Sequence, residues 1–220
     1  MSLKYELIEN DKTVNHVLPY QLKALRDFAD VKAGDFGGYV NSPDNLSHRG
    51  NCWVYDQACL YDQSKLSGNA QLRNKARMLS SATMTDNCKL IDQAKISRHA
   101  KVYGNVVIQG SAIVTGSATL NDNVVVSGCA RIDDQANVFG NVTVGDNAVI
   151  EDTGWVYDDA IICNQAKVRG RSFVKGKAVI GQQMVIAFGT VTSDLTATLS
   201  DSIRCQTGLA VNPLTTSVIC

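Results

Sequence analysis

Histidine is the side chain most suited to moving a proton near neutral pH, and the sequence contains His16, His48 and His99. His99 lies in a regularly repeating part of the chain, with Lys101 and Tyr103 just after it. It is the candidate general base, one that would deprotonate an acceptor hydroxyl or amine. A lone histidine at a turn is more often a solvated surface residue, and that alternative stays open. His48 is expected to belong to a cap.

A zinc site of the carbonic anhydrase type needs three histidines and an open fourth position. One histidine in the repeat predicts no such metal site. The seven cysteines form no C-x-x-C pair; they are Cys52, Cys59, Cys88, Cys129, Cys163, Cys205 and Cys220. No secretory signal is visible at the N-terminus, which favours reduced thiols in a cytoplasmic protein.

The elements that must position these side chains follow a six-residue repeat. From Asn51 to Gln182 the chain divides into 22 consecutive hexads without an inserted residue. The fourth position is aliphatic or Met in all 22, and the second is Ala in 14. These positions lie two apart and share one side of a strand, so we expect them to face a narrow core. The sixth is Asp nine times and Gly eight times, which is turn chemistry.

The asparagines at position one give the length of a coil. Asn51, Asn69, Asn87, Asn105, Asn123 and Asn141 recur at intervals of 18 residues. Three hexads therefore make one coil, and stacked coils place these side chains in a ladder at one corner. The sequence predicts an all-β fold, a triangular parallel β-helix of about seven 18-residue coils.

The ends of a solenoid need caps. Residues 1–50 are the predicted N-terminal β cap, with strands at 3–8 and 20–28 and a glycine-rich loop. Residues 51–182 are the β-helix. After Gln182 the repeat degrades, so residues 183–220 are predicted to be a degenerate last coil and C-terminal cap.

Positions three and five point outward, and two faces carry apolar side chains. The face that follows the asparagine corner has an apolar stripe of Ile91, Val107, Val125, Ile161 and Val179. The face that precedes that corner has Tyr103, Phe139, Trp155, Tyr157 and Phe173. Contiguous exposed apolar patches usually mark interfaces, so both faces are candidate interfaces. The alternative is the ordinary preference of β-sheets for valine and aromatic residues.

The cap, the first coil and the segment after the last hexad resemble a known family. The segments that carry the resemblance are ALRDFADVKAGDFGGYV at 24–40, NLS at 45–47, GNCWVYD at 50–56 and VIAF at 185–188. They resemble the YdcK-like proteins, a left-handed β-helix family with hexapeptide repeats from bacteria and their phages. The resemblance implies a left-handed coil and, by analogy with the superfamily, an acyltransferase. Such enzymes usually add a loop that protrudes from the prism, and this chain has no insertion between Asn51 and Gln182.

Composition narrows the function further. With 21 basic and 21 acidic residues, the chain is no nucleic-acid binder that works by bulk charge. It has no apolar run of about 18 residues, so we expect no membrane partner. The favoured interpretation is a non-enzymatic scaffold or binding protein without a cofactor, self-associating as a dimer or trimer through a flat outer face. The alternatives are an acyl-CoA-dependent acyltransferase with His99 as base, and a phage or mobile-element protein that blocks a host protein.

Overall fold

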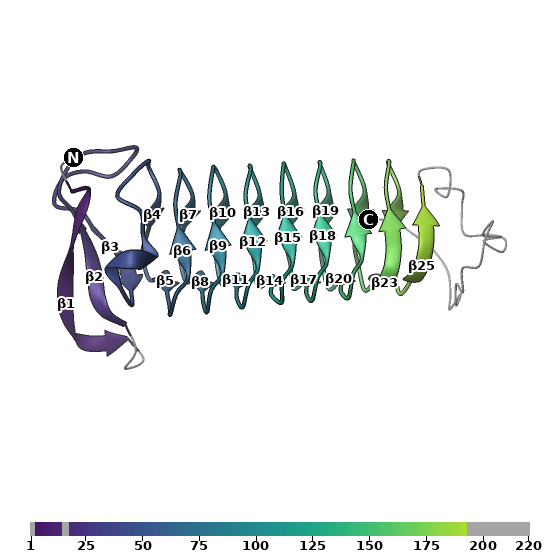
Figure 1. Ribbon diagram of the computed structural model, residues 1–220, viewed down its shortest axis with the longest axis horizontal. Coiled ribbons are helices and arrows are strands. Elements are labelled where there is room, and N and C mark those ends of the chain that lie inside the picture. The colour runs from purple at the N-terminus through teal and green to yellow at the C-terminus, as the bar shows by residue number, and fades with distance from the viewer. Residues whose placement is uncertain (1–2, 15–17, 193–220) are drawn as a thin grey trace.

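The computed structural model describes residues 3–14 and 18–192 as an all-β parallel β-helix with a hairpin cap at its N-terminal end (Figure 1). Strands pair in parallel with the strand 18 residues further along the chain, as Lys89 does with Val107 and Val107 with Val125. The predicted fold class is confirmed, and the three-hexad coil is consistent with a left-handed β-helix. Eight coils are present, because residues 183–191 complete the last one. Most of the predicted C-terminal cap, residues 193–220, lies outside the described residues.

Face 1 follows the asparagine corner and is an eight-stranded sheet with one strand per coil. Coils are numbered 1 to 8 from the hexads that begin at Asn51, Asn69, Asn87, Asn105, Asn123, Asn141, Asp159 and Lys177. The strands of face 1 are β4 (Trp53–Val54), β7 (Gln71–Leu72), β10 (Lys89–Leu90), β13 (Val107–Ile108), β16 (Val125–Val126), β19 (Thr143–Val144), β22 (Ile161–Ile162) and β24 (Val179–Ile180).

Faces 2 and 3 complete the triangle and merge at the C-terminal end, where β23 (Lys167–Val174) and β25 (Val185–Val191) run through the corner between them. Face 2 otherwise contains β5 (Cys59–Leu60), β8 (Arg77–Met78), β11 (Lys95–Ile96), β14 (Ile113–Val114), β17 (Arg131–Ile132) and β20 (Val149–Ile150). Face 3 contains β6 (Lys65–Leu66), β9 (Thr83–Met84), β12 (Lys101–Val102), β15 (Thr119–Leu120), β18 (Asn137–Val138) and β21 (Trp155–Val156).

The sixth position of all 22 hexads has a positive φ, which explains its composition. Glycine enters this left-handed region without steric cost, and Asp and Asn tolerate it better than most residues. Aspartate adds a hydrogen bond between coils, since the Asp86 carboxylate accepts one from the Gly104 backbone N–H at 2.9 Å. The Asp122 carboxylate, two coils after Asp86, accepts a hydrogen bond from the Gly140 backbone N–H in the same way. Turn geometry and coil stacking therefore select the same residue.

The predicted asparagine ladder is present at the corner before face 1. Each side-chain amide donates to the carbonyl of the next, with distances of 3.0 Å from Asn69 to Asn87 and 3.1 Å from Asn87 to Asn105. The ladder continues through Asn123 and Asn141 and ends on the Asp159 carboxylate, 2.8 Å from the Asn141 amide. These bonds tie six coils together along one edge of the prism.

The N-terminal cap must supply hydrogen-bond donors, because each coil donates its N–H groups to the carbonyls of the next coil. The carbonyls of coil 1 therefore point toward the cap. The cap consists of β1 (Tyr5–Val14), β2 (Leu18–Ala24), β3 (Phe36–Val40) and a short 3-10 helix at Pro43–Asn45. In the cap, the backbone N–H groups of Tyr39 and Asn41 donate to Ala58 and Leu60.

Candidate functional site

His99 stands at the corner between faces 2 and 3, at the start of the hexad 99–104, and its side chain is exposed. Its backbone N–H donates to the Gly116 carbonyl at 2.8 Å. Within residues 3–14 and 18–192, no hydrogen bond or ion pair holds the imidazole. A catalytic base is normally oriented by a second group, and this geometry supplies none. Lys101 is exposed nearby on face 3, and His16 lies outside the described residues.

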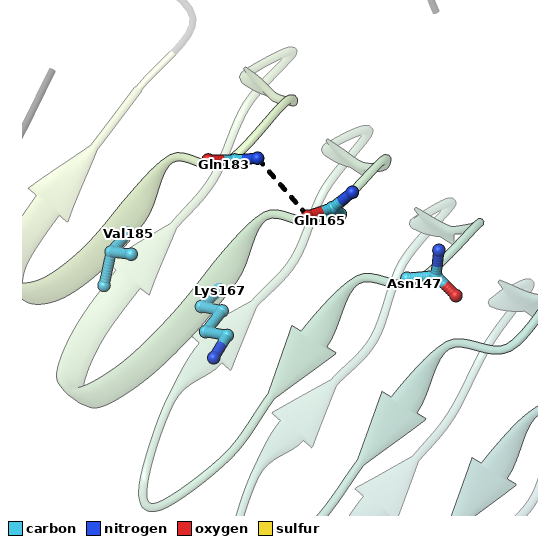
Figure 2. A pocket seen from close by; sticks show the side chains of 5 residues that line it. All are labelled: Asn147, Gln165, Lys167, Gln183 and Val185. Atoms are coloured by element: carbon cyan, nitrogen blue, oxygen red, sulfur yellow. Dashed lines mark hydrogen bonds between the residues drawn. The ribbon is translucent and has the colours of Figure 1, made fainter. Parts of the chain in front are cut away.

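A shallow open hollow of about 470 Å³ lies at the corner between faces 1 and 2, far along the chain from His99 (Figure 2). Asn147, Gln165 and Gln183 line it from three successive coils, and the Gln183 amide approaches the Gln165 side-chain oxygen at 3.5 Å. Lys167 and Val185, paired between β23 and β25, complete the wall. The hollow offers one cation and three amides, and no base or nucleophile lines it.

In the part of the chain that the structure describes, no three His, Cys, Asp or Glu side chains come together in a way that could hold a metal ion. The free thiols among these residues are Cys52, Cys59 and Cys88, which are buried, and Cys129, which is exposed. Cys163 is not one of these free thiols, so the expectation that the cysteines are reduced does not hold for Cys163. In the same ranges no helix is long and apolar enough to span a membrane.

A buried polar cluster closes the N-terminal end of the core, and the sequence gives no sign of it. The Lys4 side chain is fully buried, and its ammonium donates to the Cys52 carbonyl at 2.8 Å and the Gly50 carbonyl at 3.4 Å. The Tyr5 hydroxyl donates to the Leu46 carbonyl at 2.6 Å. His48, placed in the cap as predicted, accepts from the Lys4 backbone N–H through Nδ1. The cluster supplies the donors that the first carbonyls of the solenoid require.

Burial shifts the titration of this cluster. Desolvation lowers the pKa of Lys4, and the neighbouring Cys52 thiol partly opposes that shift. Desolvation raises the pKa of the Cys52 thiol, so this thiol is a poor nucleophile at neutral pH. The pKa of His48 is lowered by burial and by the positive charge of Lys4. The cluster has the properties of a structural plug rather than of a reactive site.

Face 1 has one covered and one open half. Over coil 1 the Phe28 ring of the cap packs edge-on against Trp53, with ring centroids 5.3 Å apart, and Trp53 is buried. The Asp30 carboxylate accepts hydrogen bonds from the Tyr55 hydroxyl and from Arg73 in coil 2. The open half is defined as positions three and five of coils 4 to 8, where every residue except the buried Cys163 and Gly181 is at least partly exposed: Val107, Gln109, Val125, Ser127, Thr143, Gly145, Ile161, Cys163, Val179 and Gly181. None of these ten residues is charged.

The structure refines the predicted apolar stripe. Val107, Val125, Ile161 and Val179 share one column of paired residues with Thr143 between them. Ile91 falls outside this column, because the residue paired with Val107 in coil 3 is Lys89. Ile161 and Val179 are the most exposed apolar members of the column, at 37% and 36%.

Four of the five residues predicted for the aromatic face form a cluster of contacting rings on the surface of face 3. Phe139 stacks on Tyr157 at 5.0 Å between ring centroids and meets Trp155 edge-on at 5.8 Å. Phe173 lies 6.2 Å from Trp155. Tyr103 lies two coils before Phe139 in the same column, with Asn121 between them, and makes no ring contact with this cluster in the described residues.

Comparison with known proteins supports the predicted resemblance over part of the chain. No family model matches the sequence. Over 79 residues the chain is 35% identical to a protein of Escherichia coli (strain K12) named "Uncharacterized acetyltransferase YdcK". The match covers 36% of this chain and 24% of the length of that protein. The predicted resemblance to YdcK is confirmed, and the β-solenoid is consistent with the hexapeptide-repeat β-helix family.

Proposed function

We propose that the protein is a non-enzymatic β-helical scaffold or binding protein that associates with itself through a flat outer face. The observation that carries the proposal is the open half of face 1, where position three of five successive coils presents an uncharged side chain that is at least partly exposed. Apolar patches that recur over several strands typically mark protein interfaces. Neither His99 nor the hollow at Lys167 offers the convergent polar groups of an active site.

Light scattering coupled to size exclusion tests this proposal. The expected mass at high protein concentration is a multiple of the 23.7 kDa chain. A mass of one chain at every concentration would contradict self-association. The measurement needs a reducing buffer, because Cys129 is exposed and free.

The second candidate function is an acyl-CoA-dependent acyltransferase, and the similarity to YdcK is the observation that favours it. In that function His99 would take the proton of the acceptor. The hollow at Lys167 provides a cation and amides for polar groups of a donor, but His99 does not line it. The residues of one chain therefore do not bring a base to this hollow, and a site would have to form between chains.

A thermal-shift assay separates the two candidates. We expect acetyl-CoA to leave the melting temperature unchanged, because a scaffold has no site for it. A rise of several degrees that is abolished by His99→Ala would favour the enzyme. His48 is unsuitable as a control because it packs in the cap, so Lys101→Ala on the exposed surface of face 3 is the matched variant.

A further inference from the structure

We propose that the C-terminal segment, residues 193–220, is fastened to face 1 by a disulfide between Cys163 and either Cys205 or Cys220. The inference goes beyond the proposed self-association and does not depend on it. The contact concerns position five of coils 7 and 8, which Cys163 and Gly181 occupy in neighbouring coils. Residues 193–220 lie outside the described residues, whereas both contact positions lie within them.

The count of cysteines identifies the segment. Cys163 is disulfide-bonded, and the chain has seven cysteines. The four free thiols are Cys52, Cys59, Cys88 and Cys129. Because a disulfide needs a second cysteine, the proposal assigns the bond to one of the two that remain, Cys205 or Cys220. Both follow Thr192, so this bond joins the C-terminal segment to coil 7.

Burial at position five is the second, independent observation. This position points outward on face 1, yet Cys163 is only 6% exposed and Gly181 is buried as well. Gly145, two coils before Gly181 in the same column, is half-buried. A residue of the last coil has a described coil on one side only, so Gly181 should be more exposed than Gly145. A segment beyond Thr192 that packs on coils 7 and 8 explains why the order is reversed.

The segment is long enough to reach this position. β25 ends at Val191 on face 3, where Val191 pairs with Val174. Cys205 follows Val191 by 14 residues, and an extended chain of that length spans about 46 Å. One face of the prism, about five residues across, is roughly 17 Å wide. The segment can therefore cross from face 3 to face 1 and turn back to coil 7.

The cover is confined to one side of face 1. At position three of the same coils, Ile161 and Val179 are 37% and 36% exposed. The segment therefore lies along the position-five column, on the side that borders the hollow lined by Gln165 and Gln183. This placement leaves the aliphatic column at position three accessible to another chain.

The disulfide gives the segment a role at the end of the sheet. β24 is the last strand of face 1 and pairs only with β22 among the described strands. An unpaired sheet edge is a template for pairing with other chains. A segment held beside Gly181 shields this edge, and reduction of the disulfide releases the segment. Face 1 is then covered at its first coils by the N-terminal cap and at its last coils by a redox-sensitive tether.

Formation of the bond requires an oxidant, for which a small disulfide such as oxidised glutathione is sufficient. One cysteine thiolate attacks the glutathione disulfide and expels the first glutathione thiol. The second cysteine thiolate then attacks this mixed disulfide and expels the second. The two protein thiols lose two protons and two electrons, and two molecules of reduced glutathione carry them away. An excess of reduced glutathione reverses the exchange.

Alkylation and mass spectrometry test the bond. After equilibration with oxidised glutathione, the unfolded but unreduced protein should take iodoacetamide on five cysteines, and on all seven after reduction. The tryptic peptide 132–167 contains only Cys163, and the peptide 205–220 contains both candidate partners. We expect these peptides to be linked until they are reduced, and chymotryptic cleavage after Leu209 distinguishes Cys205 from Cys220. A Cys163 that carries iodoacetamide or glutathione, or that is joined to a second chain, would overturn the inference.

Hydrogen exchange tests the cover. The backbone amides of residues 180–182 should exchange at least about tenfold faster in Cys163→Ser than in the oxidised wild type, while residues 144–146 keep their rates. Ser127 occupies position five two coils earlier, so a serine fits the coil at position 163. Cys129→Ser is the matched control, because it replaces an exposed free thiol and should behave as the wild type. Equal rates at residues 180–182 in Cys163→Ser and wild type would overturn the cover. A monomeric wild type that shows the expected link and rates would overturn self-association alone.

Discussion

The two halves of face 1 use the same hexad position in opposite ways. Trp53 in coil 1 is 1% exposed, whereas Ile161 in coil 7 is 37% exposed. Both side chains occupy position three and point away from the prism core. The difference is the cap, whose Phe28 and Asp30 cover the first coils. An outward apolar position in a β-helix therefore becomes buried only where another segment lies over it, and the open half lacks such a segment among the described residues.

The covered half also shows how this protein builds contact with face 1. An aromatic pair, Phe28 on Trp53, forms the apolar centre. Around it, Arg73 stacks over the Tyr55 ring at 3.8 Å and pairs with Asp30 at 2.9 Å. The open half has aliphatic residues in its position-three column and, among the described residues, lacks this charged rim.

The largest effect should come from removing the aromatic centre of the covered half. Trp53→Ala should lower the free energy of unfolding by about 3–5 kcal/mol, because it leaves a cavity between the cap and coil 1. Urea denaturation measures this loss. Trp155→Ala on face 3 is the matched control, since Trp155 is 39% exposed, and we expect it to cost less than about 1.5 kcal/mol. Equal losses in both variants would mean that the cap does not stabilise face 1.

A smaller effect is expected from Lys4→Met, which keeps the length of the side chain and removes its donors. The Gly50 and Cys52 carbonyls lose a buried partner, so unfolding should become easier by about 1–3 kcal/mol. Lys101→Met on face 3 should change stability by no more than about 0.5 kcal/mol. A neutral result for Lys4→Met would show that water satisfies these carbonyls.

The stability difference between the wild type and Lys4→Met should change with pH in a direction that follows from the pKa of Lys4. Burial lowers the pKa of Lys4, so the unfolded chain binds this proton more tightly than the folded chain. The stability of the wild type relative to Lys4→Met should therefore rise as the pH increases toward 10.5, the ordinary pKa of lysine. Denaturation series at pH 7 and above follow this difference. A difference that falls with pH would contradict the assigned burial.

The smallest effect belongs to the rim of the covered half. Asp30→Asn should cost less than about 1 kcal/mol, because Asp30 and Arg73 are both accessible to solvent. Hydrogen bonds from Tyr55 and Arg73 lower the pKa of the Asp30 carboxyl below its usual 3.8. Its contribution is present above that value and is lost as the pH falls through the lower folded pKa. The gap between wild type and Asp30→Asn at pH 6 should therefore close in strong acid.

The repeat made the body of the fold predictable and left the cap contacts unpredicted. Period two within a hexad and period 18 between asparagines are local signals, and both the core and the Asn69–Asn87 ladder follow from them. The burial of Lys4 depends on contacts with residues 46 and 48 positions away, for which no periodic signal exists. Cys59 points outward by its phase, yet it is buried in a cluster with Tyr61, Tyr39 and Leu79.

For the candidate site, too, the repeat predicts some features and leaves others unpredicted. The outward residues of faces 1 and 3 could be assigned from the hexad phase alone. The exclusion of Ile91 from the column also follows from the phase, because Ile91 is at position five whereas Val107 is at position three, and the pairing of Lys89 with Val107 agrees with it. Nothing in the phase of a repeat reports whether a partner covers a face.

Hydroxyl-radical footprinting at low and high protein concentration tests most directly whether the protein associates through face 1, because it reports the exposure of each side chain in solution. We predict that Ile161 and Val179 become protected as concentration rises, while Trp155 and Phe173 react at the same rate throughout. Protection of Trp155 and Phe173 with unchanged reactivity of Ile161 and Val179 would contradict the assignment of face 1 as the interface.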